Sequence, residues 1–177
     1  MTDLNARCLD AFPEWLKTLG SDIASLAELL GQEALDEGTR RWVAGGINYL
    51  FKSLDLIPDG IEDLGFIDDA FVVRVAAAKA LSGAPDDGTL KRLAGDAEII
   101  EAFLEEDYAR LQTYVSGLSQ VAARGRTVDE VVADAALREQ LVSEAKAWAE
   151  SYEAPTFARD EKNLVKLRAF LATKLPS

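Results

Sequence analysis

Apolar residues recur every three or four positions through most of this chain, and that spacing constrains its fold more than any other feature. In 127–152 the apolar set is Val128, Val131, Val132, Ala135, Leu141, Val142, Ala145, Trp148 and Tyr152. The same spacing runs through 96–118, and through 157–175 after Pro155. It places apolar side chains on one face of an α-helix, whereas a strand repeats every second residue. No alternating run has the length of a strand, so the sequence predicts an all-α protein.

The remaining periodic segments predict a multi-helix bundle of about seven or eight helices. Further helices are expected at 3–19, 21–30, 38–53 and 68–82. Gly20 and Gly31 would end the first two, because glycine is common just after a helix C-terminus. Thr127 and Glu130 have the spacing of a capping box, which predicts the start of the helix over 127–152.

A linker is expected at 82–88, where "SGAPDDG" is small, polar and proline-containing. It divides the chain into a helical portion over 1–82 and a C-terminal helical portion over 83–177 that packs on the first. With 177 residues the chain can form one substantial core, so we expect one compact domain overall.

The absence of histidine restricts the chemistry open to the chain. It removes Ser-His-Asp and Cys-His catalysis and zinc sites built on imidazole. The single cysteine, Cys8, cannot form an internal disulfide, and this fits a reducing cytoplasm. Any catalysis would have to use carboxylates, lysines, tyrosines or hydroxyls, so the sequence leans against an enzyme without deciding the matter. We expect a cytoplasmic protein and predict no cofactor, apart from the divalent cation considered below.

A net charge of -12 opposes binding to polyanions, so no nucleic-acid partner is expected. The longest apolar stretch, "WVAGGINYLF" at 42–51, is about half the length of a transmembrane helix. Basic residues flank aromatic ones in 40–52, which makes peripheral membrane contact through 40–54 an alternative.

One stretch, "SLDLIPDGIEDLGFIDD" at 53–69, is unlike the rest because it concentrates carboxylates between two predicted helices. Its acids are Asp55, Asp59, Glu62, Asp63, Asp68 and Asp69. In a structural interpretation this segment is a corner: Pro58 lies in a first helical turn, Gly65 adopts a left-handed backbone and Asp68 caps the next helix.

In a functional interpretation the same corner binds a divalent cation. Carboxylate oxygens suit Mg2+, Ca2+ or Mn2+, and these ions need no histidine. The first candidate metal ligands are Asp55, Asp59, Asp68 and Asp69. Their spacing does not match an EF-hand loop.

The segment "YLFKSLDLIPDGIEDLGFIDDAFVV" (49–73) resembles the signature of the YkvA-like family, domain of unknown function 1232. The matching residues are Asp55, Leu56, Ile57, Pro58, Asp59, Ile61, Gly65, Asp68 and Asp69. Ser53 and Glu62 stand where the family usually has prolines, which loosens the turn. The resemblance covers about residues 38–80. It implies a helical hairpin with a Pro-Asp corner and implies no activity.

These features favour a non-enzymatic interaction or regulatory module that presents the acidic corner or a helix groove to an unknown protein partner. The alternatives are a carboxylate-based divalent-metal protein, including a hydrolase, and a peripheral membrane protein.

Overall fold

The structure, a computed structural model, describes residues 2–52, 56–58, 60–61 and 63–176. Across these residues the chain forms helices and no strand, which confirms the all-α fold class. The α-helices are α1 (Thr2–Leu30), α2 (Glu37–Tyr49), α3 (Ile67–Ala80), α4 (Gly88–Leu104), α5 (Asp107–Ser116), α6 (Val128–Ala133), α7 (Ala135–Ser151) and α8 (Glu161–Lys174). Two short 3-10 helices are η1 (Leu81–Gly83) and η2 (Gly117–Gln120).

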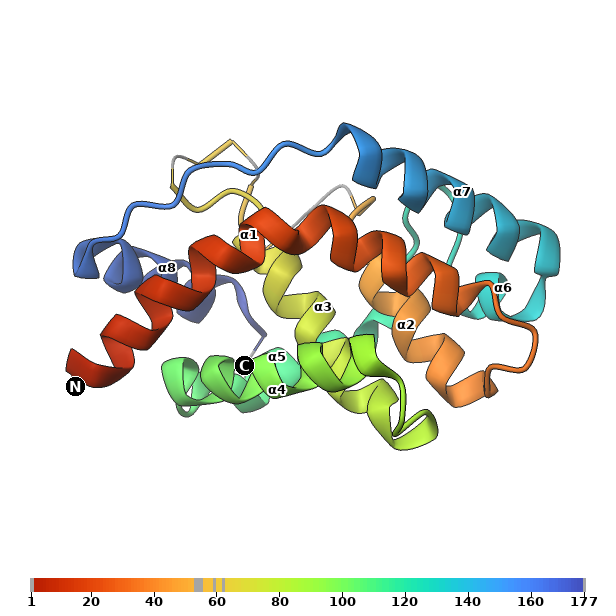
Figure 1. The fold of residues 1–177 in the computed structure, drawn as a ribbon, viewed down its shortest axis with the longest axis horizontal. Coiled ribbons are helices and arrows are strands. Elements are labelled where there is room, and N and C mark those ends of the chain that lie inside the picture. Colours follow the sequence, from red (N-terminus) through yellow and green to blue (C-terminus); the bar gives the residue numbers. More distant parts are fainter. Residues whose placement is uncertain (1, 53–55, 59, 62, 177) are drawn as a thin grey trace.

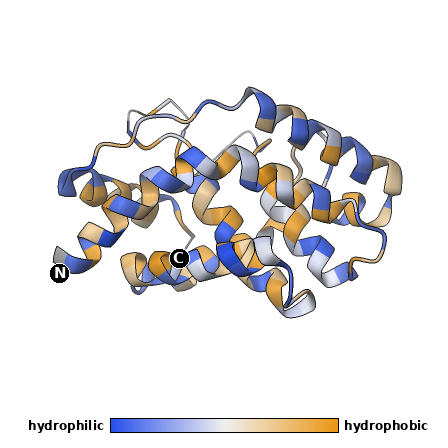
Figure 2. Ribbon diagram, in the orientation of Figure 1, coloured by the Kyte–Doolittle hydropathy of each residue, from blue (hydrophilic) through white to orange (hydrophobic). Residues whose placement is uncertain are grey.

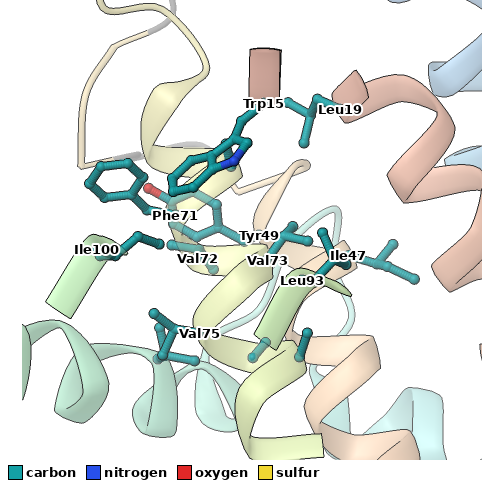
Figure 3. Close-up of a cluster of buried hydrophobic side chains, with 14 of the residues drawn as sticks. Trp15, Leu19, Ile47, Tyr49, Phe71, Val72, Val73, Val75, Leu93 and Ile100 are labelled. Atoms are coloured by element: carbon teal, nitrogen blue, oxygen red, sulfur yellow. The ribbon is translucent and has the colours of Figure 1, made fainter. Parts of the chain in front are cut away.

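Helix α3 is the centre of the bundle, and nearly all of its residues are buried. α1 crosses over it, α2 lies beside it, and α4 and α5 lie below it (Figure 1). Figure 3 shows its apolar side chains among those of the neighbouring helices. The labelled residues are Trp15 and Leu19 of α1, Ile47 and Tyr49 of α2, Phe71, Val72, Val73 and Val75 of α3, and Leu93 and Ile100 of α4. A helix covered on every side has no polar face, which fits the apolar run in 70–78.

The ring of Phe12 is the point where the two halves of the chain meet. Its centroid lies 5.1 Å from that of Phe71, 5.2 Å from that of Phe103 and 6.0 Å from that of Phe157. Edge-on contacts of this kind add to the stability given by burial alone. The predicted portions 1–82 and 83–177 therefore share apolar contacts through one side chain of α1.

Helix α1 does not end at Gly20, so the prediction of two helices over 3–30 is wrong. The role of Gly20 is to let α7 approach closely. A Cβ at this position would lie 3.2 Å from the Ala149 carbonyl oxygen and 3.3 Å from the Tyr152 ring. The glycine thus reflects helix packing, which a single-helix pattern does not reveal.

Two long predicted helices are each split in the structure. The segment 96–118 breaks at Glu105, where φ is 53°, between α4 and α5. The segment 127–152 breaks at Asp134, whose side chain accepts hydrogen bonds from the amides of Ala136 and Leu137 and caps α7. The capping box of Thr127 and Glu130 is confirmed, and it begins α6.

Apolar and hydrophilic residues alternate along the helices (Figure 2), and the buried apolar ones form one core cluster. Throughout the part of the chain that the structure describes, no helix combines the length and the apolarity that spanning a membrane requires.

We expect Phe12→Ala to lower the free energy of unfolding by about 3–5 kcal/mol, because it removes a buried ring that packs against four others. Urea unfolding followed by far-UV and near-UV circular dichroism should show one shared transition, shifted to lower urea. Val165→Ala, at a side chain 63% exposed, is the control and should change little. Two separate transitions would contradict a single shared core.

Candidate functional site

The corner between α2 and α3 is a series of tight turns. The amides of Ile61, Leu64 and Ile67 donate to carbonyls three residues earlier, over 3.1, 3.2 and 3.3 Å. The first of these carbonyls belongs to Pro58, and no helix begins there in the described part of the corner, contrary to prediction. Four apolar side chains of the corner are buried, namely Leu56, Ile57, Leu64 and Ile67, and those of Ile61 and Phe66 are half-buried.

Left-handed backbone occurs at Asp63 and Phe66, with φ of 64° and 65°, and not at Gly65 as predicted. Residues far along the chain contact both. The Thr156 hydroxyl donates to Asp63 Oδ1 at 3.1 Å. The Phe66 ring lies against Trp148 and Tyr152, at 6.0 and 5.5 Å between centroids. Such contacts offset the strain that a left-handed conformation gives to a residue with a side chain.

Asp68 joins the end of α2, the corner and the start of α3. Its Oδ2 accepts a hydrogen bond from the Tyr49 hydroxyl at 2.7 Å and one from the Ile57 amide at 3.3 Å. The same hydroxyl accepts from the Leu56 amide at 2.8 Å. Phe66 occupies the N-cap position of α3, so Asp68 lies in the first turn and does not cap the helix as predicted. The positive end of the helix dipole still stabilises a negative charge on Asp68.

Asp69 is buried beside Asp68, and both side chains are at most 1% exposed. The charges of these carboxylates affect the pKa values of two nearby tyrosines. Burial, followed by the charge of Asp68, raises the pKa of Tyr49 far above its ordinary value. Burial, followed by the charge of Asp69, raises the pKa of Tyr152. The base of the corner is therefore a buried acidic environment that keeps both phenols protonated.

Of the predicted metal ligands, the structure places Asp68 and Asp69 together, while Asp55 and Asp59 lie outside the described residues. Within the described ranges, no group of three or more acidic or cysteine side chains could hold a metal ion. Of the candidate metal ligands, the described structure therefore contains one buried pair of carboxylates, Asp68 and Asp69, at the base of the corner.

A buried arginine, Arg74 of α3, is a polar residue that the sequence analysis missed. Its Nη2 lies 3.3 Å from Asp22 Oδ2, and its Nε lies 3.0 Å from Asp96 Oδ2. The guanidinium carbon lies 4.4 Å from the centre of the Trp15 ring, in a cation-π contact. Burial lowers the pKa of Arg74, and the two carboxylates oppose that effect. The sequence does contain one indication that Arg74 is buried, because it is a lone arginine in the apolar run 70–78.

The Arg74 cluster ties α1, α3 and α4 together. Asp22 is itself 1% exposed, and its other carboxylate oxygen binds Arg92 of α4 at 2.5 Å. Every charge in this cluster faces a partner on another helix. The cluster therefore has a structural role, because it holds the three helices together.

A groove runs between α1 and α7 on the outside of the bundle, where Figure 1 shows the two helices side by side. It contains two hollows of about 370 and 450 Å3, and Lys146 lines both. Around the first hollow are Gly31, Glu33, Ala135, Arg138, Glu139, Val142 and Ser143, and around the second are Gly20, Ser21, Ala24, Glu28, Ala149 and Glu150.

We expect Tyr49→Phe to lower the free energy of unfolding by about 1–3 kcal/mol at pH 7, because it removes a buried hydroxyl that makes two hydrogen bonds. It should also change the response to alkali. An unfolded tyrosine ionises near pH 10, whereas folded Tyr49 keeps its proton. Stability from this residue is thus complete below about pH 10 and is lost as the pH rises toward the raised pKa.

The measurement is urea unfolding of the native protein and of Tyr49→Phe between pH 8 and about pH 11. The loss of stability above pH 10 should be shallower in the variant, by up to about 1.4 kcal/mol per pH unit. Equal slopes would show that Tyr49 ionises as readily in the folded protein as in the unfolded one. Asp68→Asn, alone and combined with Tyr49→Phe, tests whether the two side chains are coupled.

Comparison with known proteins gives a match for the region that contains the corner. A family model described as "Protein of unknown function (DUF1232)" matches residues 39–74, which span most of α2, the corner and the start of α3. No curated protein and no solved structure matches the chain. The resemblance found in the corner is thereby confirmed at the level of this family. Over residues 39–74 the chain is similar to a family whose function is unknown.

Proposed function

We propose that this protein is a non-enzymatic interaction module whose α1–α7 groove binds a helical segment of a protein partner. The observation that carries the proposal is the exposure of α7, because only Leu141 and Ala145 of its 17 residues are buried. Most helices of a bundle bury a wider stripe than this. One face of α7 covers α1, and the exposed residues beside that face, Glu139, Ser143, Lys146 and Glu150, border the groove.

The size and lining of the groove suit a helix. Gly20 of α1 and Gly31, directly after α1, mark its two ends, which at about 1.5 Å per residue are roughly 16 Å apart. That length matches about three turns of a docked helix. Small side chains such as Ser21 and Ala24 leave room for the side chains of a partner.

Charge favours a basic partner. The cations of the groove already have partners, since Lys146 pairs with Glu28 at 3.3 Å and Arg138 donates to the Val132 carbonyl at 2.9 Å. Among the described residues, the remaining carboxylates form no ion pair, namely those of Glu33, Glu139 and Glu150. The chain as a whole carries a charge of -12, which steers cationic segments toward it.

We expect a synthetic amphipathic helix of leucine and lysine, about fourteen residues long, to bind with an affinity that falls as salt rises. Glu139→Lys with Glu150→Lys should weaken binding about tenfold or more, because like charges then face each other across the groove. The measurement is fluorescence anisotropy of the labelled peptide.

The matched control is Glu98→Lys with Glu101→Lys on α4, which makes the same change in net charge at exposed positions away from the groove. The control should retain most of the binding. Equal weakening in both double variants would mean that the peptide responds only to overall charge, and the groove would lose its role. Binding of a leucine-glutamate peptide with equal affinity would also contradict the proposal.

A second candidate function is divalent-metal binding at the corner. It is supported by the two adjacent buried carboxylates, Asp68 and Asp69, which lie at the base of a segment rich in acids. Mg2+, Ca2+ and Mn2+ take such oxygen ligands. With a metal bound, this protein would be a carboxylate-based metal protein, and hydrolysis would be the first activity to examine.

We expect a bound metal to stabilise the fold, because a ligand at about 100 times its dissociation constant adds roughly 2.7 kcal/mol. Thermal unfolding in excess EDTA, and then in each of the three ions, should show a rise of several degrees in the midpoint. Asp68→Asn with Asp69→Asn should abolish the rise. The same midpoint in EDTA and in every ion would remove this second candidate.

A further inference from the structure

One face of α2 borders two neighbouring hollows, away from the α1–α7 groove. The larger, of about 110 Å3, is lined by Arg41, Trp42, Gly45, Val115, Ser116 and Ser119. The smaller, of about 10 Å3, is lined by Gly45, Asn48, Tyr49, Lys52, Leu118, Val121 and Ala123. On α2 these residues follow helical spacing, so the two hollows form a row along one face, with Gly45 at the junction. We call this row the α2 cleft.

Gly45 lies at a helical position where its own packing does not need a glycine. A Cβ at Gly45 would meet no atom within 4 Å. A Cβ at neighbouring Gly46 would lie 3.3 Å from Ala76 Cβ, so Gly46 is explained by the close approach of α3. Glycine destabilises a helix interior relative to alanine. What Gly45 does provide is an open floor for the α2 cleft.

Asn48 supplies a buried polar group in the same cleft. It is 3% exposed, and its amide nitrogen donates to the Arg126 carbonyl at 3.4 Å. Its Oδ1 is buried and accepts no hydrogen bond from any described residue. Buried polar atoms are almost always hydrogen-bonded, so this oxygen is suited to a donor that enters the cleft. A hollow of about 10 Å3 holds one donor group or one bridging water.

Both cations at the mouth of the cleft already have partners within the chain. Arg41 pairs with Glu37 at 3.5 Å and also with Asp129. The Lys52 amine lies 5.8 Å from the centre of the Tyr114 ring. A ligand therefore gains little from carrying a charge. The Trp42 indole and Val115 instead offer apolar contact to a ring or a short aliphatic group.

From these observations we infer that the α2 cleft binds a small neutral aromatic molecule carrying one O–H or N–H donor. The ring occupies the larger hollow against Trp42, and the donor reaches Asn48 Oδ1 past Gly45, directly or through one water. This site is separate from the α1–α7 groove and does not depend on it. Its binding would be weak for a bare ring and stronger for a ring with a donor.

The experiment is a titration of the full chain with phenol, followed by 1H–15N correlation spectra. Saturable shifts are expected at the Gly45 amide, the Trp42 indole N–H and the Asn48 side-chain amide. Benzene, which has no donor, should bind about two- to tenfold more weakly than phenol. Gly45→Leu should abolish the saturable shifts, because its side chain fills the junction of the two hollows.

Gly95→Leu is the matched control, since Gly95 is also a helical glycine whose added Cβ meets no atom within 4 Å, but it is exposed on α4. It should bind phenol as the native chain does. If Gly45→Leu fails to fold, Gly45→Ala replaces it: the melting temperature should rise by a few degrees while phenol binding weakens. No saturable shift in the native chain, shifts centred elsewhere, or unchanged binding in Gly45→Ala would each overturn the inference.

Discussion

The burial of α3 on every side is the constraint on which the rest of the structure depends. It takes Asp68, Asp69 and Arg74 out of water, and a buried charge destabilises the fold unless other groups compensate it. Compensation comes from different elements: Tyr49 at the end of α2 for Asp68, and Asp22 of α1 and Asp96 of α4 for Arg74. The polar contacts of one helix thus fix the positions of three others, in addition to the apolar packing around it.

This arrangement explains why the family match covers a segment that depends on the remainder of the chain. The matched region, 39–74, contains Tyr49, Asp68 and Arg74, but the carboxylates that face Arg74 belong to α1 and α4. Removing one partner of a buried ion pair costs about 3–5 kcal/mol, because the other charge stays buried. In residues 39–74 alone, Arg74 would have neither of its two carboxylate partners. The helices outside the match are therefore part of what makes the matched segment stable.

The sequence predicted the fold class, the capping box at Thr127 and the approximate place of the central helix, because these follow from local spacing. It failed where a contact between distant residues decides the outcome. The pattern predicts a helix end at Gly20, whereas in the structure this glycine lets α7 approach α1 closely. The breaks at Glu105 and Asp134 interrupt apolar patterns that continue across them.

The candidate site shows the same division. Asp68 and Asp69 could be selected from the sequence, since acids concentrated in a corner stand out. The phenol of Tyr49 could not, because its hydrogen bond to Asp68 spans 19 positions along the chain. The pairing of Arg74 with Asp22 spans 52 positions, and a lone arginine in an apolar run indicates burial without naming the partner. The sequence pattern thus indicates which residues are buried, whereas the partner of each buried polar group depends on how the helices pack.

The two adjacent glycines of α2 show how helix packing and an open surface can be separated within one element. Gly46 faces α3, where an added Cβ would press on Ala76 and force the helices apart. Gly45 faces the α2 cleft, where the same added atom would meet nothing. Helix propensity disfavours both residues equally, by roughly 1 kcal/mol relative to alanine. Packing returns that stability at Gly46, whereas at Gly45 the missing side chain leaves the floor of the α2 cleft open.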